Sequence, residues 1–106
     1  MDYGCGIYRT VNKIKLDGFS TITFNGTLKA RVGNDWTGIY VWSAIGQYYV
    51  NNVAAKYSLP AQTTLTGDTT LDVSELTGEF YIGLALHENT VNSDSGYIVM
   101  NSLRLS

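Results

Sequence analysis

The side chains best suited to recognition chemistry are aromatic, and their densest run lies in one stretch of the chain. Residues 36–42 read WTGIYVW, and Tyr48 and Tyr49 follow shortly afterwards. Alternate side chains of an extended strand point to opposite faces. Ile39 and Val41 therefore share one face, and Tyr40 and Trp42 share the other. We expect the aliphatic face to pack inward and the aromatic face to point outward, where flat rings stack on the C–H faces of sugars.

The predicted ligand-binding set joins these rings to polar neighbours and to one residue of a later strand. Gln47 would supply an amide for sugar hydroxyls, and Tyr81 would join the same face if its strand neighbours the strand of Tyr40 and Trp42. The alternative is that Trp42 is a core residue, or that the tyrosines lie in a subunit interface. The predicted ligand-contacting residues are Trp36, Tyr40, Trp42, Gln47, Tyr49 and Tyr81.

Residues for catalysis are sparse, and we expect that the chain is not an enzyme. The single cysteine, Cys5, would need the single histidine, His87, to act as a nucleophile. A glycosidase needs two carboxylates across a cleft, whereas most acidic residues here sit at turns, where aspartate bonds its own backbone. No catalytic residue is therefore assigned.

No cofactor or metal is expected from the ligand types present. One cysteine and one histidine do not make a zinc site. Calcium stays as an open alternative, because loop carboxylates suffice to bind it and Asp17, Asp68 and Asp94 could meet at one edge of a sandwich. Otherwise these three are ordinary turn aspartates.

Size and charge limit the other kinds of protein that this chain could be. The 106 residues predict one domain, 1–106, and the abrupt start predicts that it was excised from a longer protein. The net charge is −2, and the seven Lys and Arg residues do not cluster along the sequence, which argues against nucleic-acid binding. No apolar stretch reaches the ~20 residues of a membrane span, and no signal peptide is visible.

The turn signals are regularly spaced and predict an all-β antiparallel sandwich, of the jelly-roll type, with about eight to nine strands. Phe80 to Leu86 shows the clearest period of two. We expect a hairpin turn at Asn25-Gly26 and a β-bulge near Asn101-Ser102, where the apolar phase of the last strand shifts. Short helical turns are considered at Ala54–Tyr57 and Ser74–Leu76.

Three segments carry a resemblance to a known family. Residues 69–84 read TTLDVSELTGEFYIGL, residues 97–105 read YIVMNSLRL, and residues 17–24 read DGFSTITF. These segments resemble the C-terminal, carbohydrate-binding-like jelly-roll modules of phage and prophage tail proteins. The resemblance covers about three quarters of the chain. In similar modules the last strand often carries a calcium-binding aspartate, whereas Ile98-Val99-Met100 here has no carboxylate. The resemblance implies a fold and a recognition role, and no binding residue is carried over from it.

Together these observations predict a non-catalytic carbohydrate-binding-like recognition module. It would belong to a phage tail, as a receptor-binding part that attaches to the host, or to another extracellular or cell-surface attachment protein. The expected partner is a glycan or cell-surface polysaccharide, without nucleic acid or membrane insertion, and with a homo-oligomer such as a trimer in the parent protein. The alternative is a purely structural or oligomerisation module of a virion or surface fibre.

Overall fold

The computed structural model describes residues 5–30, 37–47, 50–60, 63–87 and 96–106. Within these ranges the chain forms eight β-strands and no helix, and the strands pair in antiparallel fashion. The strands are β1 (Cys5–Arg9), β2 (Ile14–Lys15), β3 (Thr21–Lys29), β4 (Gly38–Trp42), β5 (Val53–Ser58), β6 (Thr64–Asp72), β7 (Glu79–His87) and β8 (Tyr97–Leu105).

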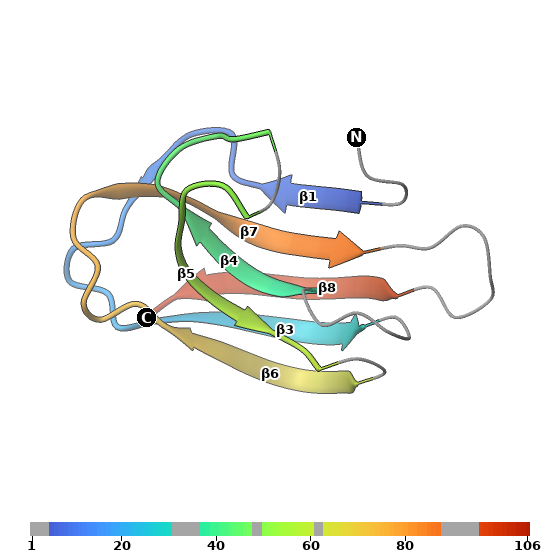
Figure 1. Cartoon of the computed structure of the whole chain (residues 1–106). Helices are drawn as coiled ribbons and strands as arrows, with labels where there is room; N and C mark the ends of the chain where they lie inside the picture. The colour runs from blue at the N-terminus through green and yellow to red at the C-terminus, as the bar shows by residue number, and fades with distance from the viewer. Residues whose placement is uncertain (1–4, 31–36, 48–49, 61–62, 88–95) are drawn as a thin grey trace.

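The strands form two facing sheets (Figure 1). One sheet has the order β1-β7-β4-β5, with β2 also pairing with β7, and the other has the order β6-β3-β8. The predicted all-β antiparallel sandwich is therefore confirmed, whereas its jelly-roll type stays a prediction. In the larger sheet β7 lies beside β4, so Tyr81 is opposite Trp42 and Gly83 is opposite Tyr40. This is the adjacency that would place Tyr81 on the aromatic face.

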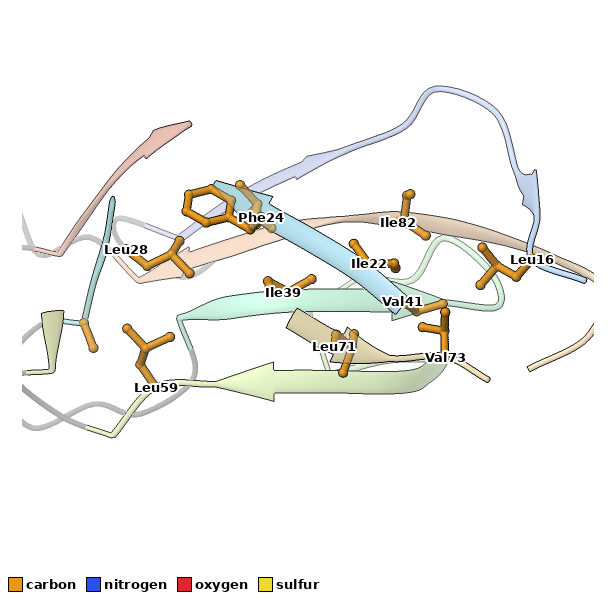
Figure 2. Packing of buried hydrophobic residues seen from close by; sticks show 12 residues of the cluster. Leu16, Ile22, Phe24, Leu28, Ile39, Val41, Leu59, Leu71, Val73 and Ile82 are labelled. Atoms are coloured by element: carbon orange, nitrogen blue, oxygen red, sulfur yellow. The ribbon is translucent and has the colours of Figure 1, made fainter. Parts of the chain in front are cut away.

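The main hydrophobic core lies between the two sheets (Figure 2). It takes the inward side chains of β3, β4, β6 and β7, which follow the period-two pattern of the sequence. Ile39 and Val41 are both fully buried in it, as predicted for the aliphatic face of β4. The other core members are Leu16, Ile22, Phe24, Leu28, Ala30, Leu59, Leu71, Val73, Ile82 and Leu84.

The predicted hairpin at Asn25-Gly26 is wrong, because β3 continues through these two residues. Ile22, Phe24 and Leu28 have the same phase along the strand, so one unbroken strand buries all three. Gly26 has a φ of 149°, and a Cβ atom there would lie 2.0 Å from the carbonyl oxygen of Val99. The close approach of β8 to β3 therefore explains the glycine at this position, and no chain reversal occurs there.

The bulge predicted near Asn101-Ser102 is confirmed. Asn25 pairs with Ser102 and Gly26 pairs with Met100, so Asn101 is the extra residue of β8. The helical turn considered at Ala54–Tyr57 is wrong, since these residues belong to strand β5. Ser74 and Glu75 lie in a turn that the N–H of Leu76 closes by donating to the carbonyl of Val73.

Candidate functional site

Tyr40 and Trp42 lie on the opposite face of β4 from Ile39 and Val41, as strand parity predicts, but they are not open to solvent. Tyr40 is 0% and Trp42 is 3% exposed. Their rings stack on each other with centroids 5.5 Å apart and planes 12° apart. Together with Ala85 they form a second apolar cluster outside the main core. The expectation that these two rings form an open stacking platform for sugars is therefore wrong.

The burial of the two rings has a local cause. On β7, the small residues Gly83 and Ala85 face the same side as Tyr40 and leave room for large rings. Further out on this face, Ile7, Arg9 and residues 44–46 of the β4–β5 connection surround Trp42 and leave a hollow of only about 20 Å³ beside it. These side chains and the connection cover Trp42, so that β4 is buried on both faces.

The remaining predicted contact residues divide into three groups. Trp36 and Tyr49 lie outside the described residues. Gln47 is exposed in the connection between β4 and β5, and no hydrogen bond ties it to another described residue. Tyr81 is half-buried and packs against the second apolar cluster. Among the predicted aromatic residues that the structure describes, Tyr40 and Trp42 are buried, and Tyr81 reaches the surface of the predicted face.

Two cations converge on the ring of Tyr81, and we call Arg9, Lys13 and Tyr81 the Tyr81 cluster. The guanidinium carbon of Arg9 lies 5.0 Å and the Nζ of Lys13 lies 5.9 Å from the ring centroid. Both distances are within the range of cation–π attraction. The sequence showed no basic cluster, because the pairing of β1 with β7 is what brings Arg9 to this ring.

The backbone at the Tyr81 cluster is anchored by Thr10. The N–H of Thr10 donates to the carbonyl of Ile82 at 2.9 Å, and its hydroxyl accepts the N–H of Ile82 at 3.3 Å. Arg9 in turn donates from Nη1 to the carbonyl of Thr10 at 2.9 Å. The guanidinium is therefore held by a hydrogen bond and by an aromatic ring, although the side chain is exposed.

A second surface feature is an apolar groove between edge strands β1 and β8. Its volume is about 820 Å³. Tyr8 and Met100, on its two sides, are 55% and 53% exposed although both have the inward phase of their strands. The other lining residues are Ile7, Arg9, Thr10, Val11, Ile14, Ile82, Gly83, Leu84, Leu103 and Leu105. We call this surface the β1–β8 groove.

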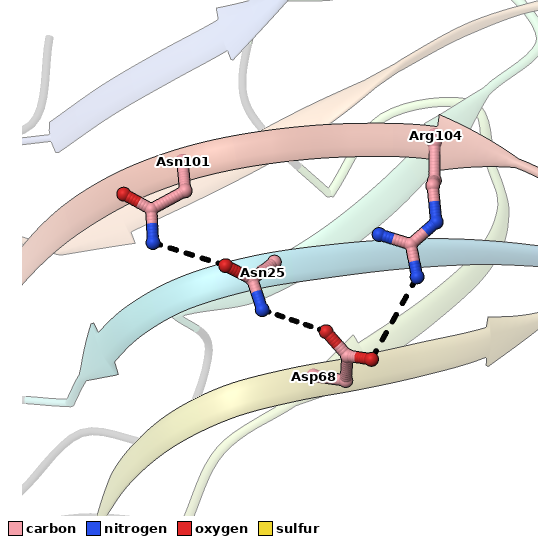
Figure 3. Close-up of polar contacts among 4 residues, drawn as sticks. All are labelled: Asn25, Asp68, Asn101 and Arg104. Atoms are coloured by element: carbon pink, nitrogen blue, oxygen red, sulfur yellow. Dashed lines mark hydrogen bonds and ion pairs between the residues drawn. The ribbon is translucent and has the colours of Figure 1, made fainter.

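The outer face of the three-stranded sheet carries a row of polar contacts (Figure 3). Asn101 donates to Asn25 at 3.0 Å, and Asn25 donates to Asp68 at 2.8 Å. Arg104 forms an ion pair with Asp68 at 3.7 Å, with both side chains about half exposed. Such an exposed pair contributes little stability, so the row mainly ties the bulged strand β8 to β3 and β6.

The aspartates considered for calcium have structural partners or lie outside the described residues. Asp68 takes part in the polar row, and Asp17 accepts the N–H of Gly78 at 2.6 Å. Asp94 lies outside the described residues. No group of three or more candidate metal ligands occurs in the part of the chain that the structure describes.

Elsewhere, the hydroxyl and the N–H of Ser74 donate to Asp72 and lower the pKa of that carboxyl.

The two residues weighed for nucleophilic catalysis are neighbours in the sheet. The ladder between β1 and β7 pairs Cys5 with His87. A nucleophile and a base alone do not make an acyl-transfer site, which also needs an orienting group and an oxyanion hole.

No helix long and apolar enough to cross a membrane occurs among the described residues. In comparisons with known proteins, no family model, curated protein or solved structure matches this chain.

Proposed function

We propose that this domain is a non-catalytic recognition module that binds cell-surface carbohydrate through the Tyr81 cluster, within a phage tail or another attachment protein. The supporting observation is the position of Tyr81, half-buried on a buried apolar base with two cations at its ring. A fixed aromatic ring loses little entropy on binding, and charged donors beside it can orient a polar ligand. The exposed amide of Gln47, on the connection that follows Trp42, stays part of the proposed contact set.

The strand order supports the jelly-roll part of the proposal. β3 pairs with β6 and β8, and β7 pairs with β2 and β4, so most neighbours in the sheets are distant in sequence. Such pairing is typical of Greek-key connections, from which jelly rolls are built. A single weak sugar site of this kind would gain strength from several copies on one particle.

We expect Tyr81→Ala to reduce glycan binding by roughly tenfold or more, as is common for a central aromatic contact. The measurement is a glycan-array screen of the wild-type chain, followed by calorimetric titration of the best ligand. Tyr57→Ala is the matched control, because Tyr57 is a 40% exposed tyrosine in the same sheet but has the phase of the opposite face.

Circular dichroism of each variant establishes that the fold is retained. Equal affinities of the wild-type chain and a folded Tyr81→Ala variant would rule out this site. Wild-type protein that binds no glycan at high concentration would rule out the proposed function itself.

The β1–β8 groove favours a second candidate, an oligomerisation module whose copies pack on one another. β8 is a nine-residue strand at the edge of its sheet, and Val99 and Met100 on it are more than half exposed. A long edge strand with exposed apolar residues readily pairs with another chain. A second copy is the natural occupant, because β8 of one chain can pair antiparallel with β8 of another about a two-fold axis.

For this second candidate we expect sedimentation equilibrium to give a mass above that of the monomer, rising with concentration. Met100→Lys would return the chain to a monomer, because it places a charge in the apolar interface. Val50→Lys is the control, since Val50 is a similarly exposed apolar residue that does not line the groove. Wild-type protein that stays monomeric at every concentration would contradict this candidate.

A further inference from the structure

The surroundings of the Tyr81 cluster are positively charged, although the chain as a whole carries a net charge of −2. Arg9 and Lys13 are both exposed, and Lys15 follows on β2. Glu79 is the acidic residue on this part of β7, where it pairs with Lys15 in the ladder. Within the described residues the one ion pair is that of Arg104 with Asp68, so neither Arg9 nor Lys13 has a carboxylate partner there.

The guanidinium of Arg9 is positioned before any ligand arrives. One of its N–H groups is used by the carbonyl of Thr10, and the ring of Tyr81 lies against its carbon. An arginine carries five N–H donors in a planar fork. The remaining donors of Arg9 bond to no described residue, and the side chain is exposed. A planar fork held in this way matches the two oxygens of a carboxylate or phosphate group.

Lys13 adds a second, less directional charge to the same place. Its Nζ lies over the same ring as the Arg9 guanidinium, so both positive charges border Tyr81. Next to Arg9, the exposed side chains of Ile7 and Ile45 offer an apolar surface. An apolar surface bordered by cations suits a sugar ring that carries a negative group, because the C–H face and the charge are both recognised.

We propose that the ligand of the Tyr81 cluster is an acidic saccharide, whose carboxylate or phosphate group is bound by Arg9 and Lys13. This inference rests on the proposed function, and it adds the charge of the ligand to it. Because the site is exposed, the attraction is screened by salt. Affinity should therefore fall as the ionic strength rises, in contrast to a site that binds neutral sugars.

The test uses ligand pairs that share a sugar backbone and differ mainly in charge. Titrations compare an oligogalacturonate with its methyl ester, and an oligosaccharide bearing mannose 6-phosphate with its dephosphorylated form. We expect at least one acidic member to bind roughly tenfold or more tightly than its neutral partner, as is usual for a charge-assisted contact. The pair with the larger difference identifies carboxylate or phosphate as the bound group.

Arg9→Gln is the decisive variant, and it should reduce affinity for the acidic ligand more strongly than affinity for its neutral partner, so that the difference between the two ligands shrinks. Lys56→Gln is the matched control, since it removes the same charge from an exposed position on β5, the other edge of the sheet. Equal binding of acidic and neutral sugars, abolished by Tyr81→Ala but unaffected by Arg9→Gln, would overturn this inference and leave the proposed function standing. The absence of binding to every saccharide would overturn both.

Discussion

Trp42→Ala is expected to lower the free energy of unfolding by about 3–5 kcal/mol, the range for removing a large buried aromatic side chain. Trp42 is 3% exposed and stacks on Tyr40, which is fully buried. Removing the indole would leave a cavity against Tyr40 and Ala85 and would take away the base on which Tyr81 packs. Urea unfolding followed by circular dichroism measures the loss, because it does not depend on tryptophan fluorescence.

Tyr57→Ala serves as the control here as well, with an expected loss of less than about 1 kcal/mol for a side chain that is 40% exposed. If Trp42→Ala were as stable as Tyr57→Ala, the second apolar cluster could not be tightly packed. Trp42→Ala is also a poor probe of ligand contact, because loss of binding would follow from loss of structure. Tyr81 and Arg9 are the better positions for that purpose.

Gly26→Ala is expected to destabilise the domain by at least about 3 kcal/mol, because overpacking and backbone strain act together. A Cβ atom at Gly26 would lie 2.0 Å from the carbonyl oxygen of Val99, which is backbone and has no rotamer to change. The φ of 149° is also one that residues with a side chain rarely adopt. β3 and β8 would have to separate, and the measurement is again the urea midpoint and its slope.

Gly67→Ala separates the effect of backbone strain from the effect of the steric overlap with Val99. Gly67 is directly opposite Gly26 in the β3–β6 ladder and has a φ of 101°, but a Cβ atom there meets nothing within 4 Å. We expect a loss of about 1–2 kcal/mol, the usual cost of placing a side chain in this region. Equal losses at the two positions would mean that the approach of Val99 to Gly26 is unimportant.

Strand parity was the most reliable inference from the sequence. It placed Ile39 and Val41 in the core and Tyr40 and Trp42 on the other face of β4, and the phase shift in the last strand located the bulge at Asn101. Parity depends only on backbone geometry and therefore needs no knowledge of neighbours. It does not say whether a face is covered, and here the β4–β5 connection and β1 residues cover Trp42.

The other errors also arise from contacts between distant segments. Asn25-Gly26 has the composition of a hairpin turn, but the approach of β8 to Gly26 explains the glycine instead. Ala54–Tyr57 has good helix formers, yet its pairing with β4 makes it a strand. The Tyr81 cluster unites residues about 70 positions apart in the printed sequence, and no local pattern reveals that β1 lies beside β7.

The two opposed glycines and the bulge interrupt the regular strand pattern along one line across the three-stranded sheet. Gly26, Gly67 and the extra residue Asn101 lie at the same level of β3, β6 and β8. Bulges and glycines allow strands to bend sharply. The sheet can therefore crease along this line, with Ile22 and Phe24 on one side and Leu28 on the other. Such a bend would help three nine-residue strands to follow the shorter strands β4 and β5 of the facing sheet.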